Sequence, residues 1–142
     1  MLLLIGACTS KKNSASSKHR CANCNMVVEK YPNWIEKAVV TGGDTLYFDG
    51  PRCMFKILLE TSKNIQTVLV KDYYNLKYTD GRTAFYVTGS DILGPMGNEL
   101  IPFSSEQAAN DFLSEHKGKR IVRFDDVDMK LVMKLAKGMK MK

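Results

Sequence analysis

Apolar and polar residues change period along this chain in an order that occurs twice. In the first half, extended stretches near residues 34–40 and at 45–48 precede a helix that starts at Asp49-Gly50-Pro51 and runs to about Glu60. Proline suits the first turn of a helix, and aspartate can cap it. A strand at residues 67–71 follows. The pattern predicts a ββαβ unit.

The second half of the chain repeats this order. The expected segments are strands at residues 77–79, 83–88, 99–103 and 120–124, and a helix from the capping-box sequence at 104–107 to about 116. Phe48-Asp49 matches Phe103-Ser104, and Ile57-Leu58 matches Phe112-Leu113 at the same spacing. Neither unit alone offers much core. We therefore expect an α+β fold of two packed ββαβ units related by a weak internal repeat.

Composition divides the chain around these two units. Residues 9–20 hold almost nothing apolar and are expected to form a flexible tether. The tail has lysines and methionines at helical spacing, which favours a basic amphipathic helix near lipid or a partner over a methionine copper relay. The expected segments are a signal remnant with its acylated cysteine at 1–8, the tether at 9–20, the first unit at 21–72, the second unit at 73–128 and the basic, Met-rich tail at 129–142.

The first residues indicate a membrane anchor. An apolar run of seven residues precedes Cys8 and is far too short to span a bilayer. Its end, Ile-Gly-Ala-Cys, resembles the cleavage and acylation site of a bacterial lipoprotein, although no basic residue precedes the run. Acyl chains on Cys8 would hold the protein at a membrane surface. The alternative is a cytosolic protein with an apolar N-terminus.

The net charge of +6 is spread through the chain, and much of it lies in the tether and the tail. No arginine-rich stripe with interleaved aromatic residues occurs, so we do not expect nucleic-acid binding. Basic ends suit a protein that lies near anionic lipid headgroups. The chain also lacks a nucleophile with a base and a phosphate-cradling loop, so we do not expect an enzyme.

Sulfur ligands gather in Cys21-Ala-Asn-Cys24-Asn-Met26. Thiolates and thioethers are the soft ligands that select Cu(I). If this segment is extended, Cys24 and Met26 project to the same side. Met96 lies between Pro95 and Gly97 in a loop, where it could be a third sulfur ligand. Core packing for Met26 and loop anchoring for Met96 are the alternatives.

Other chemistries remain open for the cysteines. Cys53 falls in the first turn of the first helix, where a role as a small buried core residue is favoured. Cys21 and Cys24 could form a disulfide or serve thiol–disulfide exchange, although the valines that follow favour a strand over the helix such enzymes use. A closed zinc site needs four ligands, and beyond the three cysteines only the remote His19 and His116 remain.

Several motifs together resemble one family over residues 21 to about 127. They are Cys-x-x-Cys-x-Met-x-Val at 21–28, Tyr-Pro-Asn-Trp at 31–34, Tyr-Phe-Asp-Gly-Pro at 47–51, Ala-Phe-Tyr-Val-x-Gly-Ser-Asp at 84–91 and Leu-Gly-Pro-Met-Gly-x-Glu-Leu-Ile-Pro-Phe at 93–103. The chain thus resembles the nitrous-oxide-reductase accessory lipoproteins (NosL).

The resemblance implies a lipid-anchored Cu(I) chaperone in the periplasm or on the outer cell surface. Its implied partners are nitrous oxide reductase and an ABC-transporter assembly complex. The implied metal ligands are Cys24, Met26 and Met96, with Cys21 as a weaker match. The chain departs from the family pattern at Asn98, where the family often has a histidine, and it has Asn25 where glycine is common.

Overall fold

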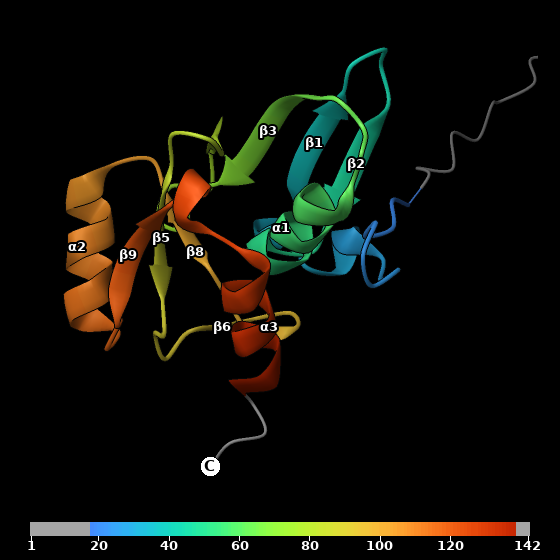
Figure 1. Cartoon of the computed structure of the whole chain (residues 1–142). Helices are drawn as coiled ribbons and strands as arrows, with labels where there is room; N and C mark the ends of the chain where they lie inside the picture. Colours follow the sequence, from blue (N-terminus) through green and yellow to red (C-terminus); the bar gives the residue numbers. More distant parts are fainter. Residues whose placement is uncertain (1–17, 139–142) are drawn as a thin grey trace, which may run out of the picture.

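The computed structural model describes residues 18–138 (Figure 1). The predicted acylation site at Cys8 and the tail methionines Met139 and Met141 lie outside this range. Within this range the strands form two antiparallel sheets and a short hairpin, and helices pack against the sheets. The α+β fold class predicted from the sequence is confirmed.

The first unit is a ββαβ arrangement with one extra strand. Its elements are β1 (Glu36–Val40), β2 (Thr45–Phe48), α1 (Pro51–Glu60), β3 (Ile65–Lys71) and the added edge strand β4 (Tyr78–Asp80). The sheet order is β2-β1-β3-β4. The strand expected at residues 77–79 was assigned to the second unit, which is wrong, because β4 pairs with β3 of the first sheet. Gly42 and Gly43 both have positive φ, so they allow the tight turn that joins β1 to β2.

The second unit has the same arrangement. Its elements are β5 (Phe85–Thr88), β8 (Ile101–Phe103), α2 (Glu106–Glu115) and β9 (Arg120–Arg123), with the sheet order β8-β5-β9. In both units the first strand is central, the second pairs on one side, and the strand after the helix pairs on the other. This shared topology is the structural form of the repeat seen in the sequence.

Short elements connect and cover the two units. The hairpin of β6 (Leu93–Gly94) and β7 (Gly97–Asn98) interrupts the second unit and carries Met96 in its turn. The others are the 3₁₀ helices η1 (Val28–Lys30), η2 (Pro32–Trp34) and η3 (Phe124–Asp126), and the helix α3 (Met129–Lys137).

The two units share a hydrophobic core. Tyr86 and Val122 of the second sheet join a buried cluster that contains Phe48, Met54 and Phe55 of the first unit. The rings of Phe55 and Tyr86 meet edge to face with centroids 5.1 Å apart. A smaller cluster lies between α2 and the second sheet. Burial of the N-terminal half of α1 fixes the position of the loop that precedes it.

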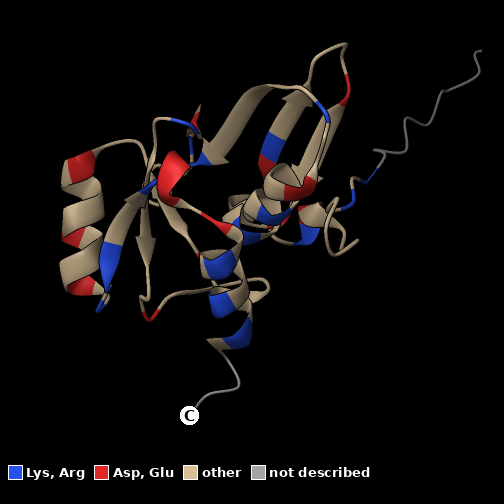
Figure 2. Cartoon of the chain, in the orientation of Figure 1, with Lys and Arg blue, Asp and Glu red and all other residues tan. Residues whose placement is uncertain are grey.

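The helix α3 uses its apolar face inside the domain. Leu131, Val132 and Leu135 are buried in the main core, where α3 contacts α1, and its lysines face outward (Figures 1 and 2). The sequence predicted an amphipathic helix near lipid or a partner; the helix is present, but its apolar side lies against the rest of the chain. No helix within residues 18–138 is both long and apolar enough to cross a bilayer.

Two predicted helix caps are wrong. Gly50, not Asp49, is the N-cap of α1, and it makes no side-chain cap hydrogen bond. Ser105 caps α2 by accepting from the backbone N–H of Ala108 at 3.2 Å. The hydroxyl of Ser104, where the capping box was predicted to begin, instead donates to Asp72. Asp49 is thereby free to act elsewhere.

Candidate metal centre

The Cys-x-x-Cys motif forms a compact turn. Cys21 donates its backbone N–H to the carbonyl of Met26 at 2.8 Å, and Asn25 donates to the carbonyl of Cys21 at 2.9 Å. Asn25 has a φ of 65°, a left-handed conformation that asparagine tolerates better than most residues. The extended segment predicted to aim Cys24 and Met26 to one side is therefore wrong, because the chain reverses between them.

The segment after this turn also differs from the prediction. Val27 forms only an isolated bridge with Arg20, and Val28 begins the 3₁₀ helix η1. The β-branched valines were expected to favour a strand. Instead, Val28 is 1% exposed in the main core and its backbone carbonyl accepts from Tyr31 within the 3₁₀ turn.

The turn is attached to strand β2. Ala22 donates its N–H to the carbonyl of Tyr47 at 2.8 Å, and Cys21 forms a parallel bridge with Tyr47. Asp49 directly follows β2, and Cys53 lies in the first turn of α1. The attachment therefore brings the Cys-x-x-Cys turn to the junction of β2 and α1.

Four side chains meet at this junction. One ligand atom from each of Cys21, Cys24, Asp49 and Cys53 lies within 4.8 Å of all the others. We call these four residues the thiol cluster. Within it, the Cys24 thiol donates to Oδ2 of Asp49 at 3.1 Å. The side-chain amide of Asn23 donates to Sγ of Cys53 at 3.2 Å.

The thiol cluster is deep on one side and open on the other. Cys21, Asp49 and Cys53 are 3%, 0% and 2% exposed, whereas Cys24 is half-buried. Oδ1 of Asp49 is buried and has no hydrogen-bond partner among the described residues. A carboxylate oxygen buried in that way is costly unless a cation or a donor meets it. The cluster therefore has the character of a cation site with Cys24 at its mouth.

The three thiols differ in acidity. The hydrogen bond with the side chain of Cys53 lowers the pKa of Cys21 to about 6. Burial, together with the neighbouring Asp49 carboxyl, raises the pKa of Cys24 to about 12. The pKa of Cys53 is also raised, because its proton is held in the bond to Cys21 and because it is buried. Cys21 is therefore the thiol that loses its proton most readily, whereas Cys24 and Cys53 hold theirs more firmly.

The structure places the four predicted metal ligands in different settings. It brings Cys21 and Cys24 together. Met96 is half-buried and packs against the core that contains Cys21 and Cys53. Met26 is half-buried just beyond the turn. Coordination by the two thioethers stays a prediction.

The two histidines make other contacts. His19 stacks on the ring of Tyr47 with centroids 3.9 Å apart, and its Nδ1 lies 2.7 Å from Glu29. His116 is the C-cap of α2, and its Nδ1 lies 3.0 Å from Asp91. Neither belongs to the thiol cluster.

Asp49 was not predicted as a ligand, and Cys53 was considered as one only for a zinc site. Asp49 was interpreted as a helix cap and Cys53 as a core residue. Cys53 is indeed buried, but it is buried next to two other thiols. The sequence carries no local signal for this role, because Cys53 lies about 30 residues from the Cys-x-x-Cys motif and only the fold brings the three thiols together.

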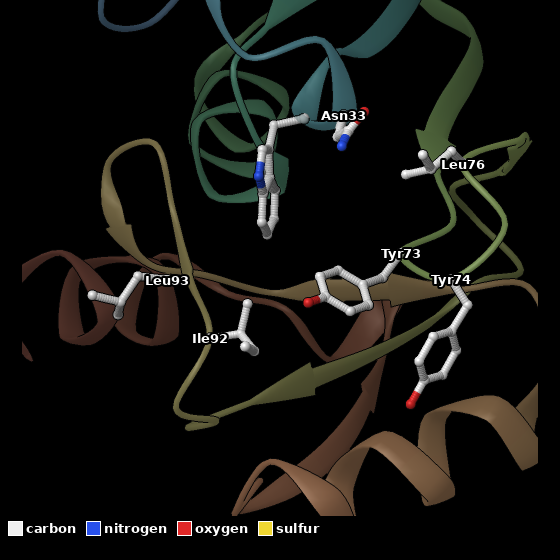
Figure 3. Close-up of a pocket in the computed structure, with 7 residues that line it drawn as sticks. Asn33, Tyr73, Tyr74, Leu76, Ile92 and Leu93 are labelled. Carbon is white, nitrogen blue, oxygen red and sulfur yellow. The ribbon is translucent and has the colours of Figure 1, made fainter.

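A separate cavity lies between the two units. It has a volume of about 410 Å³ and shares no residue with the thiol cluster. Figure 3 shows Tyr73, Ile92 and Leu76 around it. The full lining is Asn33, Trp34, Tyr73, Tyr74, Leu76, Ile92 and Leu93.

A curated copper-binding lipoprotein shares part of this sequence. The chain is 37% identical over 57 residues to the copper-binding lipoprotein NosL of Stutzerimonas stutzeri. The aligned part covers 40% of this chain and 30% of that relative, so the chain matches less than a third of its length.

Two solved structures have a similar fold. The crystal structure of the copper chaperone NosL from Shewanella denitrificans superposes with a TM-score of 0.71 at 25% identity, covering 79% of this chain and 91% of the other. The solution structure of apo-NosL from Achromobacter cycloclastes superposes with a TM-score of 0.52 at 24% identity, covering 68% of this chain and 87% of the other, which is a likeness of fold. The NosL family model matches residues 12–132, so the chain belongs to the NosL family.

Proposed function

We propose that this chain is a membrane-anchored metallochaperone that binds Cu(I) in the thiol cluster and delivers it for the maturation of nitrous oxide reductase. The observation that carries the proposal is the convergence of three thiols and one unpaired carboxylate oxygen at the β2–α1 junction. The proteins that the chain resembles are named as copper-binding or as copper chaperones.

Soft ligands favour Cu(I) over hard cations. Cys21 would supply a thiolate at neutral pH, and Cys24 and Cys53 would supply thiolates when the metal displaces their protons into the solvent. Met26 and Met96 are the proposed thioether ligands at the margin of the site. The chain binds and hands over the ion, and no catalysis is proposed.

The half-buried position of Cys24 suits transfer. A ligand of a partner protein can approach the ion from the side of Cys24 before the bonds to Cys21 and Cys53 break. We propose that the partners are nitrous oxide reductase and its ABC-transporter assembly complex. Acylation at Cys8 would place the site at a membrane facing the periplasm or the outer cell surface.

A structural zinc site is the second candidate. Three thiolates and one carboxylate are a ligand set that tetrahedral Zn²⁺ accepts. The sequence offers only remote histidines as a fourth ligand, whereas the structure places Asp49 within the cluster. Metal preference therefore separates the two functions.

An anaerobic competition titration tests the proposal. The full chain with Cys8→Ser, which removes the predicted acylation site, is reduced and titrated against a Cu(I) chelator and, separately, a Zn²⁺ chelator. We expect one tightly bound Cu(I) and a preference for Cu(I). Tighter binding of Zn²⁺, or no retention of Cu(I), would reject the copper function.

Substitutions locate the metal. Cys24→Ser should abolish Cu(I) binding, whereas Cys21→Ser and Cys53→Ser should each leave part of it. Stopped-flow transfer to metal-free nitrous oxide reductase should show rates that rise with acceptor concentration. Rates independent of the acceptor would mean simple dissociation and a storage role.

A further inference from the structure

Arg52 links the thiol cluster to the hairpin that carries Met96. It directly precedes Cys53 in the first turn of α1 and is 8% exposed. Its Nη2 donates to the carbonyl of Met96 at 2.7 Å, and its Nη1 donates to the carbonyl of Asn98 at 3.1 Å. One guanidinium therefore binds carbonyls at both ends of β7, because its donors form a rigid planar fork.

Glu99 forms a second link between the same two segments. Its Oε1 accepts from the backbone N–H of Arg52 at 2.5 Å and from that of Leu100 at 2.9 Å. A Cβ on Gly50 would clash with Oε2 of Glu99, and one on Gly94 would lie 3.2 Å from it. Glycines on both sides therefore let the start of α1 and the hairpin approach this buried carboxyl.

The helix α3 closes the arrangement from a third side. The carbonyl of Leu135 accepts from Nη1 of Arg52 at 3.4 Å and from the side-chain amide of Asn98 at 3.5 Å. Arg52 thus joins α1, β7 and α3. The backbone of Met96 is held at a set place relative to Cys53, the next residue after Arg52.

We propose that Arg52, supported by Glu99, is a positioning residue that holds the Met96 thioether beside the thiol cluster for metal binding. The inference rests on the proposed Cu(I) function and adds to it the group that brings the hairpin ligand into place. The Met96 carbonyl is bonded to the residue that directly precedes Cys53, and the Met96 side chain packs against the main core. Outer-shell groups of this kind commonly orient metal ligands.

A double-mutant cycle tests the link in the full chain with Cys8→Ser. The variants are Arg52→Gln, Met96→Leu and both together, and the measurement is Cu(I) affinity by chelator competition. Leucine keeps the volume of Met96 and removes its sulfur. We expect Arg52→Gln alone to weaken Cu(I) binding about 10- to 100-fold, the usual range for loss of an outer-shell partner. In the Met96→Leu background it should have little further effect.

Arg82→Gln is the matched control. The Arg82 guanidinium also bonds two backbone carbonyls, those of Ile65 and Gln66, at 2.9 and 3.1 Å. Arg82 is not part of the thiol cluster. Its loss should leave Cu(I) affinity unchanged. An equal effect of Arg52→Gln in both Met96 backgrounds, or no effect of Met96→Leu on affinity, would overturn the inference.

A metal-free measurement keeps this inference separate from the proposed function. Mild peroxide oxidises exposed thioethers faster than packed ones, and mass spectrometry reads each methionine. Arg52→Gln should speed oxidation of Met96 but not of Met133, which is already 41% exposed, and Arg52→Lys should give an intermediate rate. If wild-type protein retained no Cu(I), the proposed function would be rejected, but this oxidation test of Arg52 would still stand. An unchanged oxidation rate of Met96 would overturn the positioning role.

Discussion

The thiol of Cys24 donates a hydrogen bond to Oδ2 of Asp49 across 3.1 Å, although the two residues are 25 positions apart in the chain. The other oxygen of the same carboxylate is buried without a partner among the described residues. A metal that displaced the Cys24 proton would meet a sulfur and a carboxylate oxygen already in place. The pair therefore connects metal binding to proton release.

Asp49→Asn tests the part that the carboxylate has in metal selection. Asparagine keeps the shape of the side chain and removes its charge. Zn²⁺ accepts carboxylate oxygen readily, whereas Cu(I) prefers sulfur. We expect Zn²⁺ affinity to fall about tenfold or more, equivalent to about 1.4 kcal/mol, with a smaller change for Cu(I). Competition titrations with both metals measure this, and Asp44→Asn in the β1–β2 turn is the control. Equal losses for the two metals would contradict the prediction.

Met96→Ala and Met54→Ala should have opposite effects. Met54 is 0% exposed in the main core, so its truncation should lower the free energy of unfolding by about 2–5 kcal/mol. Met96 is half-buried in a turn and should cost less stability while weakening Cu(I) binding. Urea denaturation and Cu(I) competition measure the two properties. Equal stability losses, with unchanged copper affinity in Met96→Ala, would make Met96 only a packing residue.

Proton release distinguishes the possible ligand sets at pH 7. Cys21, with a pKa of about 6, is already a thiolate, whereas Cys24 and Cys53 have raised pKa values and hold their protons. Binding through all three sulfurs should release about two protons for each Cu(I), since bound cysteines are deprotonated. Calorimetry in buffers of different ionisation enthalpy counts them. Cys53→Ala should remove about one proton from that count; an unchanged count would exclude Cys53 as a ligand.

Glu99 should make stability depend on pH. Burial raises the pKa of Glu99 from its ordinary value of 4.5 to about 8. Between these values the folded protein keeps a proton that the unfolded chain has lost, so this contribution to stability is full below pH 4.5 and is lost as pH rises to about 8. At about 1.4 kcal/mol for each pH unit, the loss amounts to at most about 5 kcal/mol.

Glu99→Gln should remove the part of the pH dependence of stability that comes from Glu99. Urea denaturation at pH 5 and pH 8 gives the difference in stability for each protein. Burial also raises the pKa of Glu36, so part of the slope should remain in the variant. A slope identical to that of wild type would show that Glu99 is ionised in the folded protein at both pH values.

The sequence by itself determined most of the longer helices and strands and their order. The strand Thr45–Phe48 and the helix that starts at Pro51 lie where the pattern placed them. Apolar periodicity, proline in a first turn and glycines in turns act within a few residues, so they are legible without the fold. The elements of the repeated ββαβ order and the soft ligands of the Cys-x-x-Cys motif can likewise be recognised from short stretches of sequence.

The composition of the site was decided only by tertiary structure. Asp49 and Cys53 join Cys21 and Cys24 because the turn pairs with Tyr47 at the end of β2. No local period records a distance between segments about 30 residues apart. The same holds for Arg52, whose role depends on the approach of β7 and α3 to the start of α1. Packing of distant segments sets these distances, and with them the pKa values and the ligands that can share one ion.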